Sequence, residues 1–387
     1  MDHDGKWYAT ISIDGCNSSR EEVATQGCAA GGALDLWTSP KLRGPGAEWR
    51  RIGKMITTNK TPLDSSVTAE FVTSNFFGNV PGDPRGGRTR VVTHNGGHVN
   101  SGTPIFYLGL QANGSQFLDT AGKMEFAAPG EIGMLDWGAF QPNNVSGAKG
   151  TKALAGGQSP GLLMARTLGG DPNQVVKPGR RTLTAWGRAS HTFQTLLQDI
   201  TLGKGSAGEV VLMQQFIPEL QMLRSADKSA LASSQQFEVV AAIAPPAVPG
   251  KVAFTVLGSV RIGVDFAAEL VFVDTGAAQP PPKHGDGRAS SVHAGPLYMS
   301  SSTAPVHVHA IIDHSIVAVI FGNRTSLTVS VTPGEHDVGV GRAPGVAMRA
   351  WALRTANNNE RAATAGGVGS APPWLLPKIH NAPACLG

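Results

Sequence analysis

The sequence predicts an all-β fold. Its 387 residues include 49 glycines and 26 prolines, and both residue types disfavour long helices and are common in turns. Short segments rich in β-branched and aromatic residues recur between turn residues, a pattern typical of a sandwich, a barrel or a propeller. Hydrophobic residues make up 41% of the chain and charged residues 16%, so a sizeable core can be buried. The length favours two domains.

The first predicted strands lie beside turn signals. Pairs such as Asn-Gly, Gly-Gly and Pro-Gly, which interrupt strands, stand next to most of these segments. The strands are expected at 6–12, 89–93, 104–110 and 181–187. After them, the range 209–224 is richer in Leu, Met and Gln. Pro218 interrupts this range, which predicts a strand followed by a short helical connection.

A polar stretch at 225–234 marks the expected domain boundary. One domain is placed at 1–224 and a second at 225–387. The second domain is predicted to be an antiparallel sandwich, because short apolar strands again alternate with turns. These strands are expected at 237–243, 252–257, 306–311, 316–321 and 326–331. Gly322-Asn323, between the last two strands, is a hairpin signal.

The charge pattern excludes two classes of partner. The net charge is +4, from 32 basic and 28 acidic residues that are well mixed along the chain. Because no basic stripe forms, nucleic acid is not expected to bind. No apolar run is long enough to cross a membrane, so no membrane span is expected.

The sequence carries conflicting signals about its compartment. Residues 1–5 have neither the basic nor the apolar region of a signal peptide. Five Asn-x-Ser/Thr sequons nevertheless favour a secreted protein. They begin at Asn17, Asn59, Asn113, Asn144 and Asn323. Together these features predict that N-terminal residues are missing from the chain. Cys16 and Cys28 flank a short loop, and they form either a local disulfide or two buried thiols.

Several segments, in order along the chain, resemble those of one enzyme family. The range 179–187 (GRRTLTAWG) is similar to a strand of its catalytic domain, and 311–317 (IIDHSIV) is similar to a strand of its sandwich domain. Further similar segments are 135–140 (LDWGAF), 194–202 (QTLLQDITL), 214–224 and 294–297. Through these segments the chain resembles glycoside hydrolase family 32, the family of invertases, inulinases and fructan hydrolases.

The resemblance implies a partial five-bladed β-propeller of about three blades, followed by a C-terminal β-sandwich. It also implies a β-fructofuranosidase-type glycosidase that hydrolyses fructosyl bonds with retention, and no cofactor. In such a reaction one carboxylate attacks the anomeric carbon and a second donates a proton to the leaving oxygen. The expected partner is sucrose or a fructan oligosaccharide. The expected location is secreted, cell-wall or vacuolar.

The resemblance assigns the general acid/base to Glu70. The family's Cys-Pro pair near this position is replaced here by Phe71-Val72, and the alternative is a strand-end glutamate that faces solvent. The family's nucleophile and Arg-Asp-Pro motifs have no match in the chain. Asp171-Pro172-Asn173 and Asp83-Pro84-Arg85 are interpreted as turns.

Without the nucleophile motif, we expect that the chain by itself does not hydrolyse sucrose. A second function is therefore kept, a non-catalytic carbohydrate-binding remnant of such an enzyme. A propeller that lacks blades exposes strand edges, which favour pairing with another chain. A homo-oligomer is therefore one expected state.

Four residues resemble family positions that bind substrate. They are Asp136, Trp137, Phe140 and Trp186. An aromatic ring in this part of the family fold is able to stack on the apolar face of a sugar. Ordinary strand packing is the alternative at each position.

Two histidines lie two residues apart in a predicted strand. His307 and His309 therefore point to the same face, with Asp313 and His314 nearby. Such a group is able to bind a metal. We expect solvent-facing strand residues instead, so no metal site is predicted.

Overall fold

The described part of the chain is almost entirely β-structure. The computed structural model describes residues 6–13, 33–57, 72–77, 80–87, 89–96, 103–110, 132–137, 181–183, 186–188, 192–194, 196–226, 229–276 and 291–354. Strands β1 to β22 and two short 3-10 helices, η4 and η5, make up their secondary structure. The predicted all-β fold class is confirmed. No helix in the described ranges has the length and hydrophobicity needed to cross a membrane.

The first part of the chain forms small antiparallel sheets. One has the order β1-β2-β3 and the next has the order β4-β5-β6-β7. The strands are β1 (Trp7–Ile13), β2 (Ala33–Ser39), β3 (Arg50–Thr57), β4 (Val72–Phe77), β5 (Thr89–Gly96), β6 (Thr103–Leu110) and β7 (Ile132–Met134). The strands predicted at 6–12, 89–93 and 104–110 are confirmed as β1, β5 and β6. Each sheet is an up-and-down meander, as in a propeller blade, and the number of blades stays a prediction.

Two further sheets follow, and they correct one prediction. Strands β8 (Arg181–Leu183), β11 (Gln198–Lys204) and β12 (Val210–Phe216) form a sheet in the order β12-β11-β8. Strands β9 (Trp186–Arg188) and β10 (Thr192–Gln194) form a separate pair. The single strand predicted over 181–187 is therefore wrong. It is two strands, because β8 pairs with β11 whereas β9 pairs with β10.

A short helical connection leads out of β12, as predicted. Helix η4 (Pro218–Leu223) follows β12, and η5 (Ser229–Ser233) precedes the sandwich. Pro218 separates the two elements, as predicted, since β12 ends at Phe216 and Pro218 stands in the first turn of η4. The missing N–H and the fixed φ of proline suit the start of a helix.

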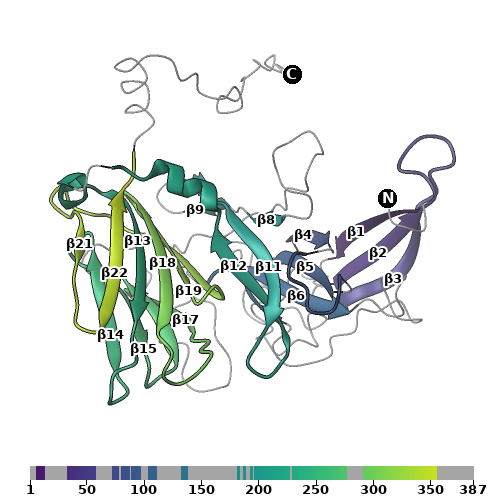
Figure 1. The fold of residues 1–387 in the computed structure, drawn as a ribbon. Helices are drawn as coiled ribbons and strands as arrows, with labels where there is room; N and C mark the ends of the chain where they lie inside the picture. The colour runs from purple at the N-terminus through teal and green to yellow at the C-terminus, as the bar shows by residue number, and fades with distance from the viewer. Residues whose placement is uncertain are drawn as a thin grey trace, which may run out of the picture.

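The C-terminal part is a sandwich of two five-stranded antiparallel sheets, as predicted. Figure 1 shows this sandwich beside the smaller sheets, with β11 and β12 between them. One sheet has the order β20-β19-β18-β13-β22 and the other has the order β17-β16-β15-β14-β21. The strands are β13 (Gln236–Ile243), β14 (Lys251–Val256), β15 (Val260–Asp265), β16 (Leu270–Asp274), β17 (Val292–Pro296), β18 (Val306–Asp313), β19 (Ile316–Phe321), β20 (Thr325–Ser330), β21 (Val340–Gly341) and β22 (Val346–Ala352).

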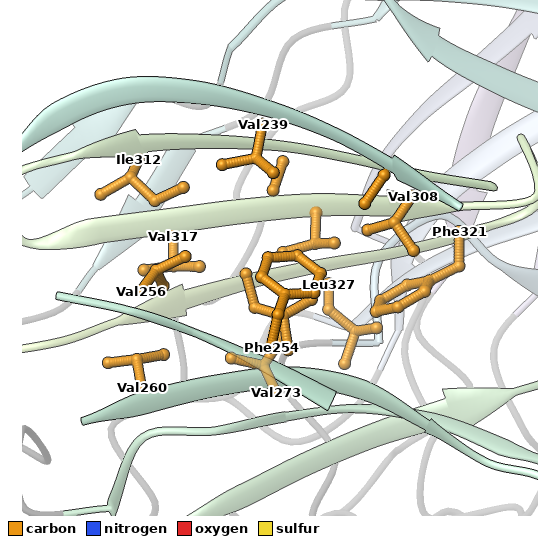
Figure 2. Close-up of a cluster of buried hydrophobic side chains, with 14 of the residues drawn as sticks. Val239, Phe254, Val256, Val260, Val273, Val308, Ile312, Val317, Phe321 and Leu327 are labelled. Atoms are coloured by element: carbon orange, nitrogen blue, oxygen red, sulfur yellow. The ribbon is translucent and has the colours of Figure 1, made fainter. Parts of the chain in front are cut away.

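The core of the sandwich lies between the two sheets. Inward-facing side chains of both sheets interdigitate there, among them Val239, Phe254 and Leu327 (Figure 2). Each fully buried Val, Leu or Phe side chain contributes about 1.5–3 kcal/mol. This core therefore supplies most of the stability of the C-terminal part.

Strands β19 and β20 are buried on both faces. Val317, Val319 and Phe321 point into the sandwich core, whereas Ala318 and Ile320 join a second cluster with Phe216 of β12. A strand that alternates between core and solvent would show a period of two in its burial. These strands do not, because the outer face of their sheet is covered by the first part of the chain.

Gly295 shows how closely Trp137 approaches the sandwich. Trp137, which follows β7, packs against the sandwich core. A Cβ atom at Gly295 of β17 would lie 2.8 Å from Trp137 Cγ and 2.7 Å from Thr325 Cγ2. Gly295 is therefore required by space and not by its backbone conformation.

Gly295→Ala is expected to lower the free energy of unfolding of the full chain by about 1–3 kcal/mol, because the added methyl group overpacks the contact. Gly250→Ala is the matched control, since the nearest atom to its Cβ would be Val248 O at 3.8 Å. Denaturant unfolding of both variants measures the difference. Equal midpoints for the two variants would contradict the close approach of Trp137.

Candidate functional site

The structure describes three of the five residues predicted to form the site. Glu70 and Phe140 lie outside the described residues, as do Asp171-Pro172-Asn173, Cys16 and Cys28. Trp186 lies in β9, opposite Gln194 of β10, and only its backbone is described. The catalytic assignment of Glu70 and the substrate contacts of Phe140 and Trp186 stay predictions.

The turn predicted at Asp83-Pro84-Arg85 is confirmed. The Gly86 N–H donates to the Asp83 carbonyl at 3.1 Å. The Asp83 carboxylate accepts the N–H groups of Arg85 and Thr89, each at 2.9 Å. These three donors all lie within six residues of Asp83, so this aspartate stabilises a loop, as is usual for Asp-Pro turns.

Asp136 lies in a buried contact between the two parts of the chain. It is 6% exposed. Its Oδ1 accepts the Thr328 N–H at 2.9 Å, and its Oδ2 accepts the Thr328 hydroxyl at 2.6 Å and the Ser326 hydroxyl at 3.2 Å. Three donors from β20 therefore surround a carboxylate that follows β7. Such hydrogen bonds favour the ionised carboxylate and compensate its burial.

The residues on either side of Asp136 pack into two different hydrophobic cores. Leu135 packs with Val91 of β5 and Ile200 of β11, in the core of the first part of the chain. Trp137 packs against the sandwich core, and its N–H donates to the Ser326 carbonyl at 2.7 Å. The segment 135–137 therefore joins the two parts, with its central carboxylate hydrogen-bonded to the edge strand β20.

Two glutamines extend this polar contact. Gln198 of β11 donates from Nε2 to the Ser326 hydroxyl at 3.4 Å, and the Gln214 N–H of β12 donates to the Asn323 carbonyl at 2.7 Å. Strands β11 and β12 are thus tied to the β19–β20 hairpin through both side-chain and backbone groups.

The described contacts of Asp136 and Trp137 favour the packing alternative. Both residues are held by the sandwich, and Asp136 has little surface left to meet a sugar. Their substrate-binding role stays a prediction. What the structure adds is their joint function, since they lock the two parts of the chain together.

A second buried carboxylate lies on the same outer face of the sheet. The side chain of Glu238 in β13 is 1% exposed. Arg224, which follows η4, donates to both oxygens of this carboxylate at 2.6 and 2.8 Å. His309 Nε2 lies 2.7 Å from Glu238 Oε1 and donates to it, because an ionised carboxylate only accepts.

The charges around Glu238 control its ionisation. Burial by itself would raise the pKa of Glu238, but the hydrogen bonds from Arg224 and His309, together with their charges, lower that pKa to about 2. Arg224 also stacks on Trp351, with its Cζ 3.9 Å from the ring centroid, a cation–π contact. The edge of Phe216 meets His309 at a ring-centroid distance of 4.9 Å.

This cluster corrects the interpretation of the histidine pair. His307 is exposed, as expected, but His309 is half-buried and paired with Glu238. Its exposure to solvent was predicted wrongly, because the alternation of β18 does not reveal that Phe216 and Glu238 cover this face. Within the described ranges, no group of three His, Cys, Asp or Glu side chains is arranged to hold a metal ion.

Asp136→Ala is expected to lower the free energy of unfolding by about 1–3 kcal/mol, because three buried donors lose their acceptor. A double-mutant cycle with Thr328→Val should give a coupling energy of at least about 0.5 kcal/mol, measured by denaturant unfolding. Glu335→Ala, at an exposed position, is the control. Strict additivity of the Asp136 and Thr328 substitutions would contradict the contact.

The low pKa of Glu238 predicts acid sensitivity. Its folded pKa of about 2 lies below the ordinary value of 4.5. The stabilisation is therefore complete above about pH 4.5 and is lost as the pH falls towards 2, by on the order of 3 kcal/mol. Glu238→Gln should unfold more easily at pH 7 and should lose less stability than the wild type between pH 5 and pH 2.5. Parallel stability–pH curves for the two proteins would contradict the assignment.

The comparisons with known proteins extend this description. Residues 212–342 match the sequence profile described as "Glycosyl hydrolases family 32 C terminal". No curated protein sequence matches the chain. Among solved structures, the fold is similar to a fructosyltransferase from A. japonicus, with a TM-score of 0.60 and 14% identity, covering 90% of this chain and 66% of that chain.

Two further structures share the fold. The sucrose-6-phosphate hydrolase from Lactobacillus gasseri matches with a TM-score of 0.59 and 11% identity, over 91% of this chain and 64% of that one. The fructan 1-exohydrolase IIa from Cichorium intybus, in complex with 1-kestose, matches with a TM-score of 0.57 and 13% identity, over 92% and 70%. The chain spans about two thirds of the length of these enzymes. The resemblance predicted from the sequence is confirmed, since residues 212–342 match the C-terminal domain of glycosyl hydrolase family 32.

Proposed function

We propose that this protein is a β-fructofuranosidase-type glycoside hydrolase that acts on sucrose or fructans with retention. The observation that carries the proposal is the family match of residues 212–342. The similar folds support it, because their names describe fructosyl transfer, hydrolysis of sucrose-6-phosphate and fructan hydrolysis. Because the identity is only 11–14%, those activities are carried over to this chain as a proposal.

In this proposal Glu70 is the general acid/base. It protonates the oxygen that leaves the fructosyl unit and then activates water to release the sugar from the enzyme. The attacking carboxylate is not supplied by a family motif in this chain. The segment 135–137 supports this arrangement by holding the sandwich against the sheets that precede it.

The alternative is a carbohydrate-binding protein of the same ancestry without hydrolytic activity. The observation in its favour is the missing nucleophile motif in the 387 residues. Both functions use the same fold, so they differ in turnover and not in architecture.

The 387-residue chain, expressed as it stands, is expected to release no fructose from sucrose, 1-kestose or inulin. Purified protein and a Glu70→Gln variant are assayed together for free glucose and fructose. Fructose release that is lost in Glu70→Gln would overturn this expectation, and another carboxylate would then be the nucleophile.

The coding sequence upstream of Met1 decides between the two functions. If it encodes an Asn-Asp-Pro-Asn and an Arg-Asp-Pro motif, the extended protein should hydrolyse sucrose, and Glu70→Gln should reduce kcat by about 10²–10⁴-fold. If the extended protein is inactive, or if the variant keeps full activity, the hydrolase proposal fails. Fructan binding by calorimetry without sugar release would then support the carbohydrate-binding alternative.

A further inference from the structure

We propose that Asn323 is the acceptor of an N-linked oligosaccharide when the chain passes through a eukaryotic secretory pathway. Asn323-Arg324-Thr325 is a sequon, and such a site requires a surface loop. The other four sequons lie outside the described residues. This inference does not depend on the proposed hydrolase activity.

The backbone presents Asn323 at the tip of a tight hairpin. It lies between β19 and β20, and the Arg324 N–H donates to the Phe321 carbonyl at 3.0 Å. Gly322 and Asn323 both have positive φ, 56° and 58°. Glycine adopts positive φ readily, and Asn tolerates it better than most residues, so both residue types suit this turn. The predicted hairpin at Gly322-Asn323 is thereby confirmed.

The side chain of Asn323 is exposed to solvent, whereas its backbone carbonyl takes part in a hydrogen bond. The residue is exposed, whereas its carbonyl accepts the Gln214 N–H at 2.7 Å. The backbone of the turn is therefore fixed by β12, and the side-chain amide of the exposed Asn323 is open to solvent. An attached sugar chain would extend into solvent without displacing any contact described here.

The hydroxyl of Thr325 has a structural role after folding. Thr325 is 1% exposed, and its hydroxyl donates to the Pro296 carbonyl at 2.7 Å. In the folded chain this bond would keep the Thr325 hydroxyl from the enzyme that transfers the glycan. Modification must therefore precede closure of the β19–β20 hairpin, as it does when the glycan is added during synthesis.

The transfer is a substitution at carbon. The Asn323 amide nitrogen forms a bond to C1 of an oligosaccharide carried on a polyprenyl diphosphate. The bond between C1 and the diphosphate oxygen breaks, the lipid diphosphate leaves, and the amide nitrogen loses one proton. No electrons are gained or lost.

The glycan would stand beside an exposed aromatic residue. Arg324 stacks on Tyr298, with its Cζ 3.7 Å from the ring centroid, and Tyr298 is 40% exposed. A sugar chain at the hairpin tip would add polar groups beside this stacked pair, which fits a solubilising modification.

The test is glycopeptide mass spectrometry of the full chain, directed by a leader into the secretory pathway of yeast cells. A glycan mass on the peptide that contains Asn323, removed by an amidase that converts Asn to Asp, is the expected result. An unmodified Asn323 in the secreted chain, whether or not the other sequons carry glycans, would overturn the proposal.

Two matched variants separate the sequon from the fold. Asn323→Gly keeps the positive-φ turn and should lose this glycan alone, with an unchanged unfolding midpoint in protein made without glycosylation. Thr325→Ser keeps both the hydroxyl donor and the sequon and should keep the glycan. Loss of the glycan in Thr325→Ser together with normal folding, or its retention in Asn323→Gly, would contradict the assignment.

Discussion

The buried carboxylate of Asp136 is the interaction on which the junction depends. Ser326 and Thr328 direct polar groups from β20 to the outer face of the sandwich, and these groups are buried. Buried donors without an acceptor are costly, so β20 is stable in this position only when a carboxylate reaches it. That carboxylate comes from a residue about 190 positions earlier in the chain. The sandwich and the sheets before it therefore form one folded structure.

The outer face of this sheet is organised as two polar anchors around an apolar centre. Asp136 binds β20 at one edge, and Glu238 of β13 binds His309 of β18 and Arg224, which follows η4. Between them lies the cluster that includes Phe216 and Ile320. Apolar burial is non-directional and supplies most of the free energy. The two buried carboxylates, which require exact partners, instead determine the orientation in which the parts meet.

The sequence was sufficient for a part of the strands but not for this face. Strands such as β5 and β6, and the Gly322-Asn323 hairpin, follow from turn residues that act locally. The environment of His309 and Asp136 does not follow from local sequence. Alternation along a strand indicates to which face a side chain points, but not which other part of the chain packs on that face. Polar residues at alternate positions of β20 are typical of a solvent-facing side. Here they meet a distant carboxylate. The resemblance identified the family, but Glu70, the acid/base that it implies, lies outside the described residues.

The junction also solves a problem of sandwich architecture. Strands β20 and β17 are edge strands of their sheets, and an open edge is a template for pairing with another chain. The Trp137 N–H satisfies the Ser326 carbonyl, the Asp136 carboxylate satisfies the Thr328 N–H, and the Trp137 ring lies against Gly295 of β17. Two consecutive residues thus cap one edge strand and close the side of the sandwich towards the other. Asp136 and Trp137 therefore join the sheets and protect their edges, whichever other role they have.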